Sequence, residues 1–119
     1  MYMPRISSAT PLRRYRLGTY RAVLLGDIES VGAVAYLYIL YILAVVADGA
    51  PEPLLYVASE VNALADADGG SHFLGVFDER GHGNGGASNE WADPDLFAQK
   101  ALSIALERLD LSEPPEQLV

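Results

Sequence analysis

The sequence predicts an α+β fold, in which an antiparallel β-meander of about four strands carries one C-terminal helix packed on one face. Two observations support this prediction. The 119 residues fit a single domain of ordinary globular composition, with 50% apolar and 20% charged residues. The strand-like segments also come together and precede one helical segment, whereas a parallel sheet would require strands and helices to alternate.

The expected strands are rich in β-branched and aromatic residues and are separated by turn-forming segments. They cover residues 20–25, 33–47, 54–61 and 72–77, and a glycine-rich connection follows at 78–90. The DGAPEP segment after the second strand is typical of a longer hairpin loop. We expect a flexible lead-in at 1–11, one folded domain at 12–111 and a frayed tail at 112–119.

The helix is predicted at 93–110 by its capping residues and its apolar spacing. Asp93 can accept hydrogen bonds from free backbone N–H groups, and Pro94 suits the first helical position because it has no N–H to satisfy. The apolar residues that recur at helical spacing are Phe97, Ala101, Ile104 and Ala105. Trp91, just before the cap, is expected to pack the preceding loop onto the core.

The apolar run at 31–47 has no charged residue, and seventeen such residues are the lower limit for a membrane-spanning helix. Its tyrosines lie in the middle of the run, whereas interfacial tyrosines would lie at its ends. The run also begins too late in the chain for a secretory leader. We therefore expect a strand and no association with membranes.

Both faces of the expected strand at 33–47 are apolar. Strict alternation puts Tyr36 and Tyr38 on one face and Ile39 and Tyr41 on the other. One helix can cover only one face, and exposed apolar patches of this size are rare on monomers. We therefore expect a homodimer with Tyr36, Tyr38 and Tyr41 at its interface. The alternatives are coverage by the N-terminal arm, by a strong curl of the sheet, or by a small ligand held against it.

Charge is unevenly distributed along the chain. Residues 1–26 carry five arginines and no acid, whereas residues 27–119 carry all sixteen acids against three bases, which leaves a net charge of −8. Attraction between the basic arm and the acidic body is the simpler interpretation, and a phosphate-binding arm is the alternative. The acidic body would repel nucleic acid. The absence of cysteine fits a reducing compartment, so we expect a cytoplasmic protein.

The densest polar cluster in the sequence is a candidate metal or small-molecule site. It consists of His72, Asp78, Glu79 and His82, whose imidazole and carboxylate groups can bind zinc, iron or manganese. The spacing matches no metal motif, and His72 and His82 would be separated by about one strand length, roughly 20 Å. The simpler interpretation is the end of a strand followed by a solvated turn.

Two further features of the sequence bear on a possible chemical role. The segment at 81–86 matches the glycine pattern of dinucleotide-binding loops, but the helix begins several residues later and no parallel strand follows. Glu60 lies on an apolar strand, where burial would favour an acid–base role, while solvent exposure or pairing with an arginine is the simpler interpretation. No cofactor is predicted.

These patterns favour a small acidic interaction or structural protein without enzymatic activity, which forms a homodimer and engages a basic protein partner through its acidic surface. The first alternative is a small-molecule or metal-binding domain that uses His72, Asp78, Glu79 and His82. The second is a nucleic-acid-binding protein that uses the arginine-rich arm.

Overall fold

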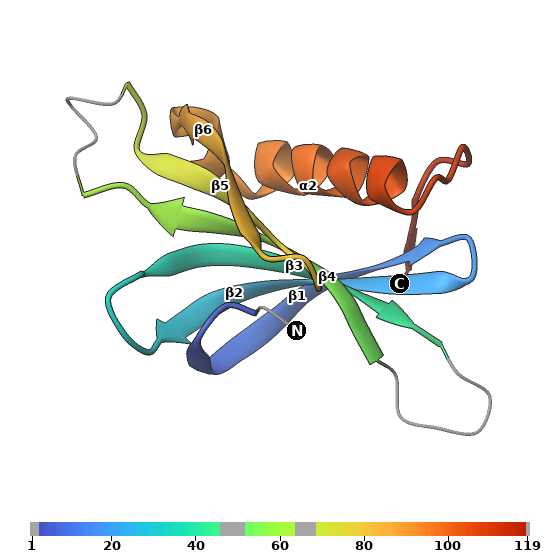
Figure 1. Cartoon of the computed structure of the whole chain (residues 1–119). Helices are drawn as coiled ribbons and strands as arrows, with labels where there is room; N and C mark the ends of the chain where they lie inside the picture. Colours follow the sequence, from blue (N-terminus) through green and yellow to red (C-terminus); the bar gives the residue numbers. More distant parts are fainter. Residues whose placement is uncertain (1–2, 46–51, 64–68, 119) are drawn as a thin grey trace.

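The computed structural model describes residues 3–45, 52–63 and 69–118, and in these residues seven strands form one antiparallel sheet (Figure 1). The strands are β1 (Ile6–Leu17), β2 (Tyr20–Ser30), β3 (Tyr36–Ala44), β4 (Glu52–Val61), β5 (His72–Phe77), β6 (His82–Ser88) and β7 (Glu116–Leu118). Their order in the sheet is β6-β5-β4-β3-β2-β1-β7. The predicted α+β class and antiparallel sheet are confirmed, and the predicted number of about four strands is wrong.

Three strands were missed because their sequences lack the usual strand signals. β1 begins at Ile6, inside the expected lead-in, and its Pro11 interrupts the pattern. β6 lies in the glycine-rich connection, where glycine has low strand propensity. β7 lies in the expected tail and pairs with β1 from Arg14 to Arg16. Tertiary pairing therefore makes strands of segments that local propensity assigns to loops.

β1 is long and irregular, and this irregularity shapes the domain. Its pairing with β2 shifts register three times between Ile6 and Arg13, and such bulges bend a strand away from the plane of the sheet. The Val31 N–H donates to the Arg5 carbonyl at 2.9 Å, which holds the beginning of β1 in place. The bent part, residues 3–11, forms an arch over one face of the sheet, which we call the N-terminal arch.

The opposite face of the sheet carries the helix. α2 (Pro94–Arg108) begins as predicted, because the Asp93 carboxylate accepts from the N–H groups of Asp95 at 2.8 Å and Leu96 at 3.1 Å. The helix lies along this face of the sheet, which we call the helix face (Figure 1). Its buried residues pack there, and the ring centroids of Phe97 and Tyr38 stack 5.8 Å apart. No helix among the described residues is long and apolar enough to cross a membrane.

A short 3-10 helix, η1 (Asn89–Ala92), connects β6 to α2. Trp91 in η1 packs against the buried cluster of the helix face, as predicted. The buried Ser59 hydroxyl donates to the Trp91 carbonyl at 2.7 Å, so β4 fixes the start of the helical segment. The connection from the sheet to α2 is therefore attached to the centre of the domain.

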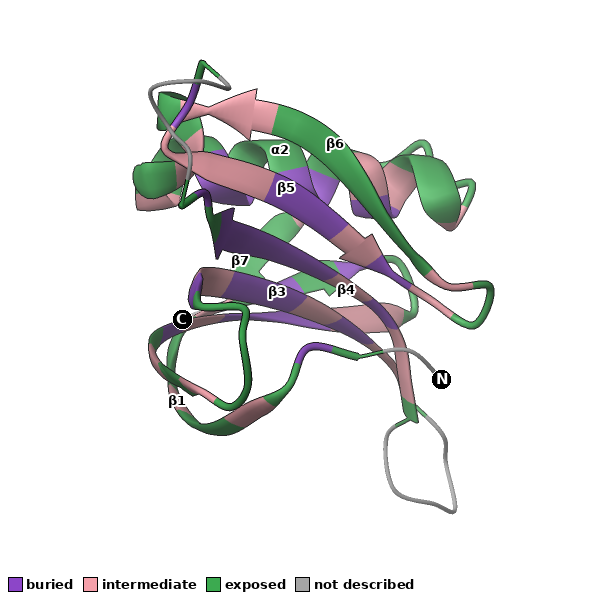
Figure 2. Cartoon of the chain, turned by 60° about the vertical axis from the view of Figure 1, so that its left-hand side comes forward, coloured by how far each residue is buried: buried purple, intermediate pink, exposed green. Residues whose placement is uncertain are grey.

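The other face, which we call the second face, has its own buried cluster of Tyr36, Ile39, Ala58 and Phe77. Strict alternation put Tyr36 and Tyr38 on the same face, and this is wrong. The pairing of β3 with β4 shifts register between these two residues, so Tyr36 joins the second face while Tyr38 joins the helix face. Figure 2 shows buried residues running along the central strands of the sheet.

Candidate functional site

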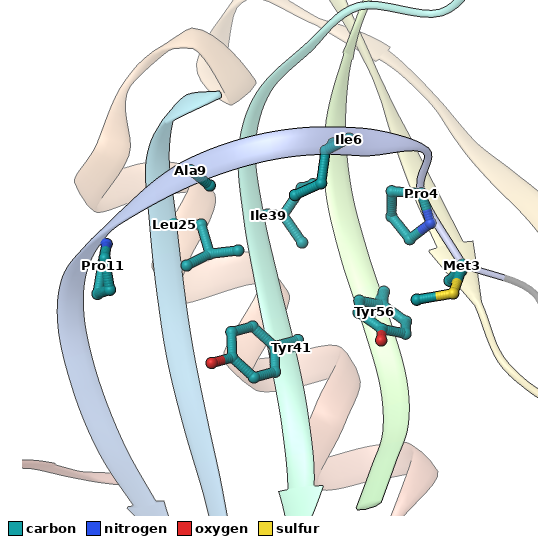
Figure 3. A pocket seen from close by; sticks show the side chains of 9 residues that line it. All are labelled: Met3, Pro4, Ile6, Ala9, Pro11, Leu25, Ile39, Tyr41 and Tyr56. Atoms are coloured by element: carbon teal, nitrogen blue, oxygen red, sulfur yellow. The ribbon is translucent and has the colours of Figure 1, made fainter. Parts of the chain in front are cut away.

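An apolar pocket lies on the second face, beneath the N-terminal arch (Figure 3). Its volume is about 360 Å³, within the range of roughly 300–1,000 Å³ that small-molecule sites occupy. The arch and three central strands supply its lining: Met3, Pro4, Ile6, Ala9, Pro11, Leu25, Ile39, Tyr41 and Tyr56. The bulged strand thus leaves a cavity where a regular one would have packed flat.

Two tyrosines provide the polar atoms of this second-face pocket. Tyr41 and Tyr56 are register partners on β3 and β4, with ring centroids 6.3 Å apart, and they stand at the end of the pocket away from the crown of the arch (Figure 3). Burial raises the pKa of Tyr56 above its ordinary value, and the neighbouring Tyr41 raises this pKa further. The Tyr56 hydroxyl therefore stays protonated at neutral pH and can donate a hydrogen bond.

The row of side chains that begins at these tyrosines continues across the sheet. Tyr56 pairs with Phe77 on β5, and Phe77 pairs with His82 on β6. The His82 ring lies flat on the Phe77 ring, with centroids 3.9 Å apart and planes inclined by 8°. An aromatic row of Tyr41, Tyr56, Phe77 and His82 thus leads from the pocket to the edge strand.

His82 is held by a buried carboxylate. Its Nε2 lies 3.0 Å from Oε2 of Glu60, whose side chain is 8% exposed, whereas the His82 side chain is 34% exposed. Glu60 reaches His82 over the backbone of Gly75, which lies on the strand between them. A Cβ at Gly75 would overlap the Glu60 carboxylate and come within 3.1 Å of His82 Nε2. The missing side chain at Gly75 therefore creates the space in which the pair forms.

Tyr36 connects this pair to the second-face cluster. It is the register partner of Glu60, and its ring meets the edge of Phe77 with centroids 6.3 Å apart. Burial raises the pKa of Tyr36, and the Glu60 charge raises it further, while a backbone hydrogen bond with Arg5 opposes the shift. Tyr36 therefore stays neutral beside the carboxylate and contacts the beginning of the N-terminal arch.

Several features here depart from what favours stability alone. Glycine inside a strand weakens it, and a buried carboxylate costs free energy unless it is paired. Such local departures concentrate at functional sites. The second face therefore carries the candidate functional site, which consists of the second-face pocket and the Glu60–His82 pair.

The four residues of the predicted metal site are not brought together. His72 and His82 belong to opposite ends of β5, because His72 begins that strand and His82 pairs with its last residue, Phe77. Asp78 accepts from the N–H groups of Arg80 and Gly81 and pairs with Arg108 at 2.6 Å. Glu79 is exposed. Among the described residues no group of three potential ligands could hold a metal ion.

His72 gives the chain a dependence on pH. Burial lowers the pKa of His72, so as pH falls below about 6.5 the unfolded chain binds this proton before the folded chain does. Stability from His72 is complete above pH 6.5 and is lost as pH falls towards the lowered pKa. The free energy of unfolding, measured in urea, should fall from about pH 7.5 to about pH 5.5, and we expect His72→Gln to make this fall smaller. An equal fall in the unmodified protein and in the His72→Gln variant would contradict this role of His72.

Some arginines of the predicted arginine-rich arm form ion pairs with acidic residues. Arg13 pairs with Asp95 at 2.6 Å, and Arg16 pairs with Glu116. Attraction between the basic arm and the acidic body is thus present at two of the five arginines. Arg5 and Arg14 make no ion pair with another described residue. The pairs connect β1 to the C-terminal elements, which helps to fasten α2 and β7 to the sheet.

The sequence pointed to Glu60 and His82 separately but not to their contact. Twenty-two positions separate them, and they meet only because β6 forms in the glycine-rich segment. One signal could have found the contact, because a glycine within an apolar strand such as HFLGVF often marks the close approach of another group.

Comparison with known protein families, with characterised proteins and with solved structures finds no significant match to this chain.

Proposed function

We propose that this protein is a small-molecule-binding domain that holds a compact apolar group in the second-face pocket. The observation that carries the proposal is the cavity of about 360 Å³ between the N-terminal arch and the sheet, lined by apolar side chains and two tyrosines. Sites for small molecules have this composition, with a few polar atoms among apolar walls. An aromatic ring system or a medium-length alkyl chain fits the lining.

The surroundings of the pocket support a ligand without negative charge. The chain carries a net charge of −8, and Glu60, the one carboxylate that the described residues contribute to the second-face site, is already paired with His82. An anion would be repelled by the overall field of the protein. The hydroxyls of Tyr41 and Tyr56, which line the pocket, offer hydrogen bonds to an uncharged polar group.

The neutral fluorescent probe N-phenylnaphthylamine tests this proposal. We expect it to bind with a dissociation constant of about 1 to 100 μM and to gain fluorescence, as burial of an apolar probe of this size provides. Ala9→Trp fills the pocket from the arch and is expected to weaken binding at least about tenfold, because the indole occupies the space of the probe.

Ala92→Trp is the matched control, because Ala92 is an exposed residue of η1 outside the lining of the pocket. This variant is expected to bind the probe as the unmodified protein does. Absence of binding to the unmodified protein would contradict the proposal, and so would equal loss of binding in the two variants.

The homodimer and the basic protein partner expected from the sequence stay predictions. The apolar second face suggested the dimer, but this face has another cover. Ile6 of the N-terminal arch packs on its buried cluster, and Ile39, Ala58 and Phe77 are already buried within one copy. A second copy is therefore not required to explain the apolar sequence of β3.

A further inference from the structure

We propose that the edge strand β6 is the contact surface for a second copy of this chain, and that two β6 strands pair in antiparallel orientation to join two sheets into one. This contact is separate from the second-face pocket. It also differs from the homodimer expected from the sequence, in which Tyr36, Tyr38 and Tyr41 would form the interface.

The two edges of the sheet differ in how well they are protected from pairing with another strand. β6 and β7 are the outermost strands. β7 has only three residues, Glu116–Leu118, begins with an acid and directly follows Pro114 and Pro115. Short length, charge and proline are the features by which proteins protect an edge. β6 is seven residues long, His82–Ser88, and contains no proline, lysine or acid. These features therefore protect the β7 edge and are missing from β6.

The outer side of β6 offers backbone groups to a further strand. Five of its seven residues, His82–Gly86, are exposed (Figure 2). β6 pairs with β5 alone, so its outward N–H and C=O groups meet no other strand in the part of the chain that the structure describes. Its register shift lies opposite Leu74, and His82–Asn84 pair regularly before it. Unpaired groups on a regular strand are a template for another strand.

Gly83 has no evident role within a single copy. Its φ lies outside the left-handed region, and a Cβ there would have no neighbour within 4 Å. Gly86 differs, because its φ of 88° at the register shift favours glycine. Glycine inside a strand often marks the close approach of another backbone. No described group comes close to Gly83, so the approach of a second molecule accounts for this glycine.

Two charged residues flank β6 and make this edge complementary to itself. Arg80 lies two residues before the strand and Glu90 two residues after it, and both are exposed. Neither forms an ion pair with another residue of the described ranges. When two β6 strands overlap fully in antiparallel orientation, Arg80 of each copy comes beside the partner's Glu90. Parallel overlap would instead bring like charges together.

A second copy fits this edge better than an unrelated peptide. An added peptide is recognised through pockets for its alternate side chains, whereas β6 contains three glycines and no large apolar residue. Two-fold symmetry forms both pairs of Arg80 with Glu90 at once. The joined sheet would then end at two β7 strands, which are the protected edges. Assembly therefore stops at two copies, and the second-face pocket stays outside the contact.

Sedimentation velocity of the full chain between about 1 and 500 μM tests the proposal. We expect a dimer with a dissociation constant of about 1 to 100 μM. Arg80→Glu and Glu90→Arg each place like charges beside one another twice, so each should weaken dimerisation at least about tenfold at low salt. The double variant restores both pairs and should return the dissociation constant to within about threefold of the original value.

Arg14→Glu and Glu113→Arg are the matched controls, because they make the same changes in net charge at exposed positions near the opposite edge. Both should dimerise as the unmodified protein does. Arg80→Glu should also bind N-phenylnaphthylamine unchanged, since Arg80 does not line the second-face pocket. The result for dimerisation is therefore independent of the result for the pocket.

Amide hydrogen exchange locates the contact. Outward amides of β6 should exchange at least about fivefold more slowly above the dissociation constant than below it, whereas the amides of β7 should not change. A protein that stays monomeric at 500 μM would overturn the proposal and leave the edge to a different occupant. A dimer that both single charge variants leave intact, or that the double variant does not restore, would overturn it as well.

Discussion

Replacing Gly75 by alanine is expected to lower the free energy of unfolding by about 3 kcal/mol, the sum of overpacking and of breaking the hydrogen bond of the buried Glu60 carboxylate. The added methyl group would occupy the position of the Glu60 carboxylate, and little room is left because His82 Nε2 would lie 3.1 Å away. Glu60 would then be displaced from His82. Urea unfolding measures the loss, and the His82 ring ¹⁵N signals report the broken contact.

Gly83→Ala is the matched control for Gly75→Ala. Gly83 lies on the neighbouring strand β6, and a Cβ there would have no neighbour within 4 Å. This substitution should change stability by no more than about 0.5 kcal/mol. Adding Glu60→Ala to Gly75→Ala should recover part of the lost stability, because the clash and the unpaired charge are both removed. Equal effects of the two glycine substitutions would rule out this account of Gly75.

Phe97→Ala is expected to cost about 3 to 5 kcal/mol of stability, the usual cost of removing a buried aromatic side chain. Phe97 is 0% exposed and stacks on Tyr38, so its loss leaves a cavity between α2 and β3. A domain of this size has a total stability of about 5 to 15 kcal/mol, and the substitution therefore removes a large share of it. Thermal and urea unfolding should both report the loss.

Leu96→Ala provides the comparison on the same helix. Leu96 is the preceding residue and is 41% exposed, so its truncation should cost less than about 1 kcal/mol. Similar losses for the two variants would mean that α2 does not pack on the sheet through Phe97. This pair of variants tests the helix face separately from the second face.

The helix and the central strands could be predicted from the sequence because their signals are local. The Asp93-Pro94 cap fixes the start of α2, and the predicted strand at 72–77 coincides with β5. The missed strands depend on partners far along the chain. β6 consists largely of glycine and small residues, so only its pairing with β5 makes it a strand.

The candidate site was less predictable than the fold, because irregular pairing creates it. The bulges in β1 form the arch over the pocket, and the register shift in β3 moves Tyr36 to the second face. Neither has a local sequence signal beyond the prolines that flank the start of β1. The sequence did indicate that both faces of β3 are apolar, and the second face is where the pocket lies.

The most direct test of a binding site on the second face is an NMR titration of methyl-labelled protein with n-octanol. Leu25 and Ile39 line the pocket, whereas Leu40 and Ile42 are buried beneath α2 on the helix face. We predict that the methyl signals of Leu25 and Ile39 shift in proportion to occupancy while those of Leu40 and Ile42 stay in place. Shifts confined to Leu40 and Ile42, or no shifts at saturating n-octanol, would contradict the account.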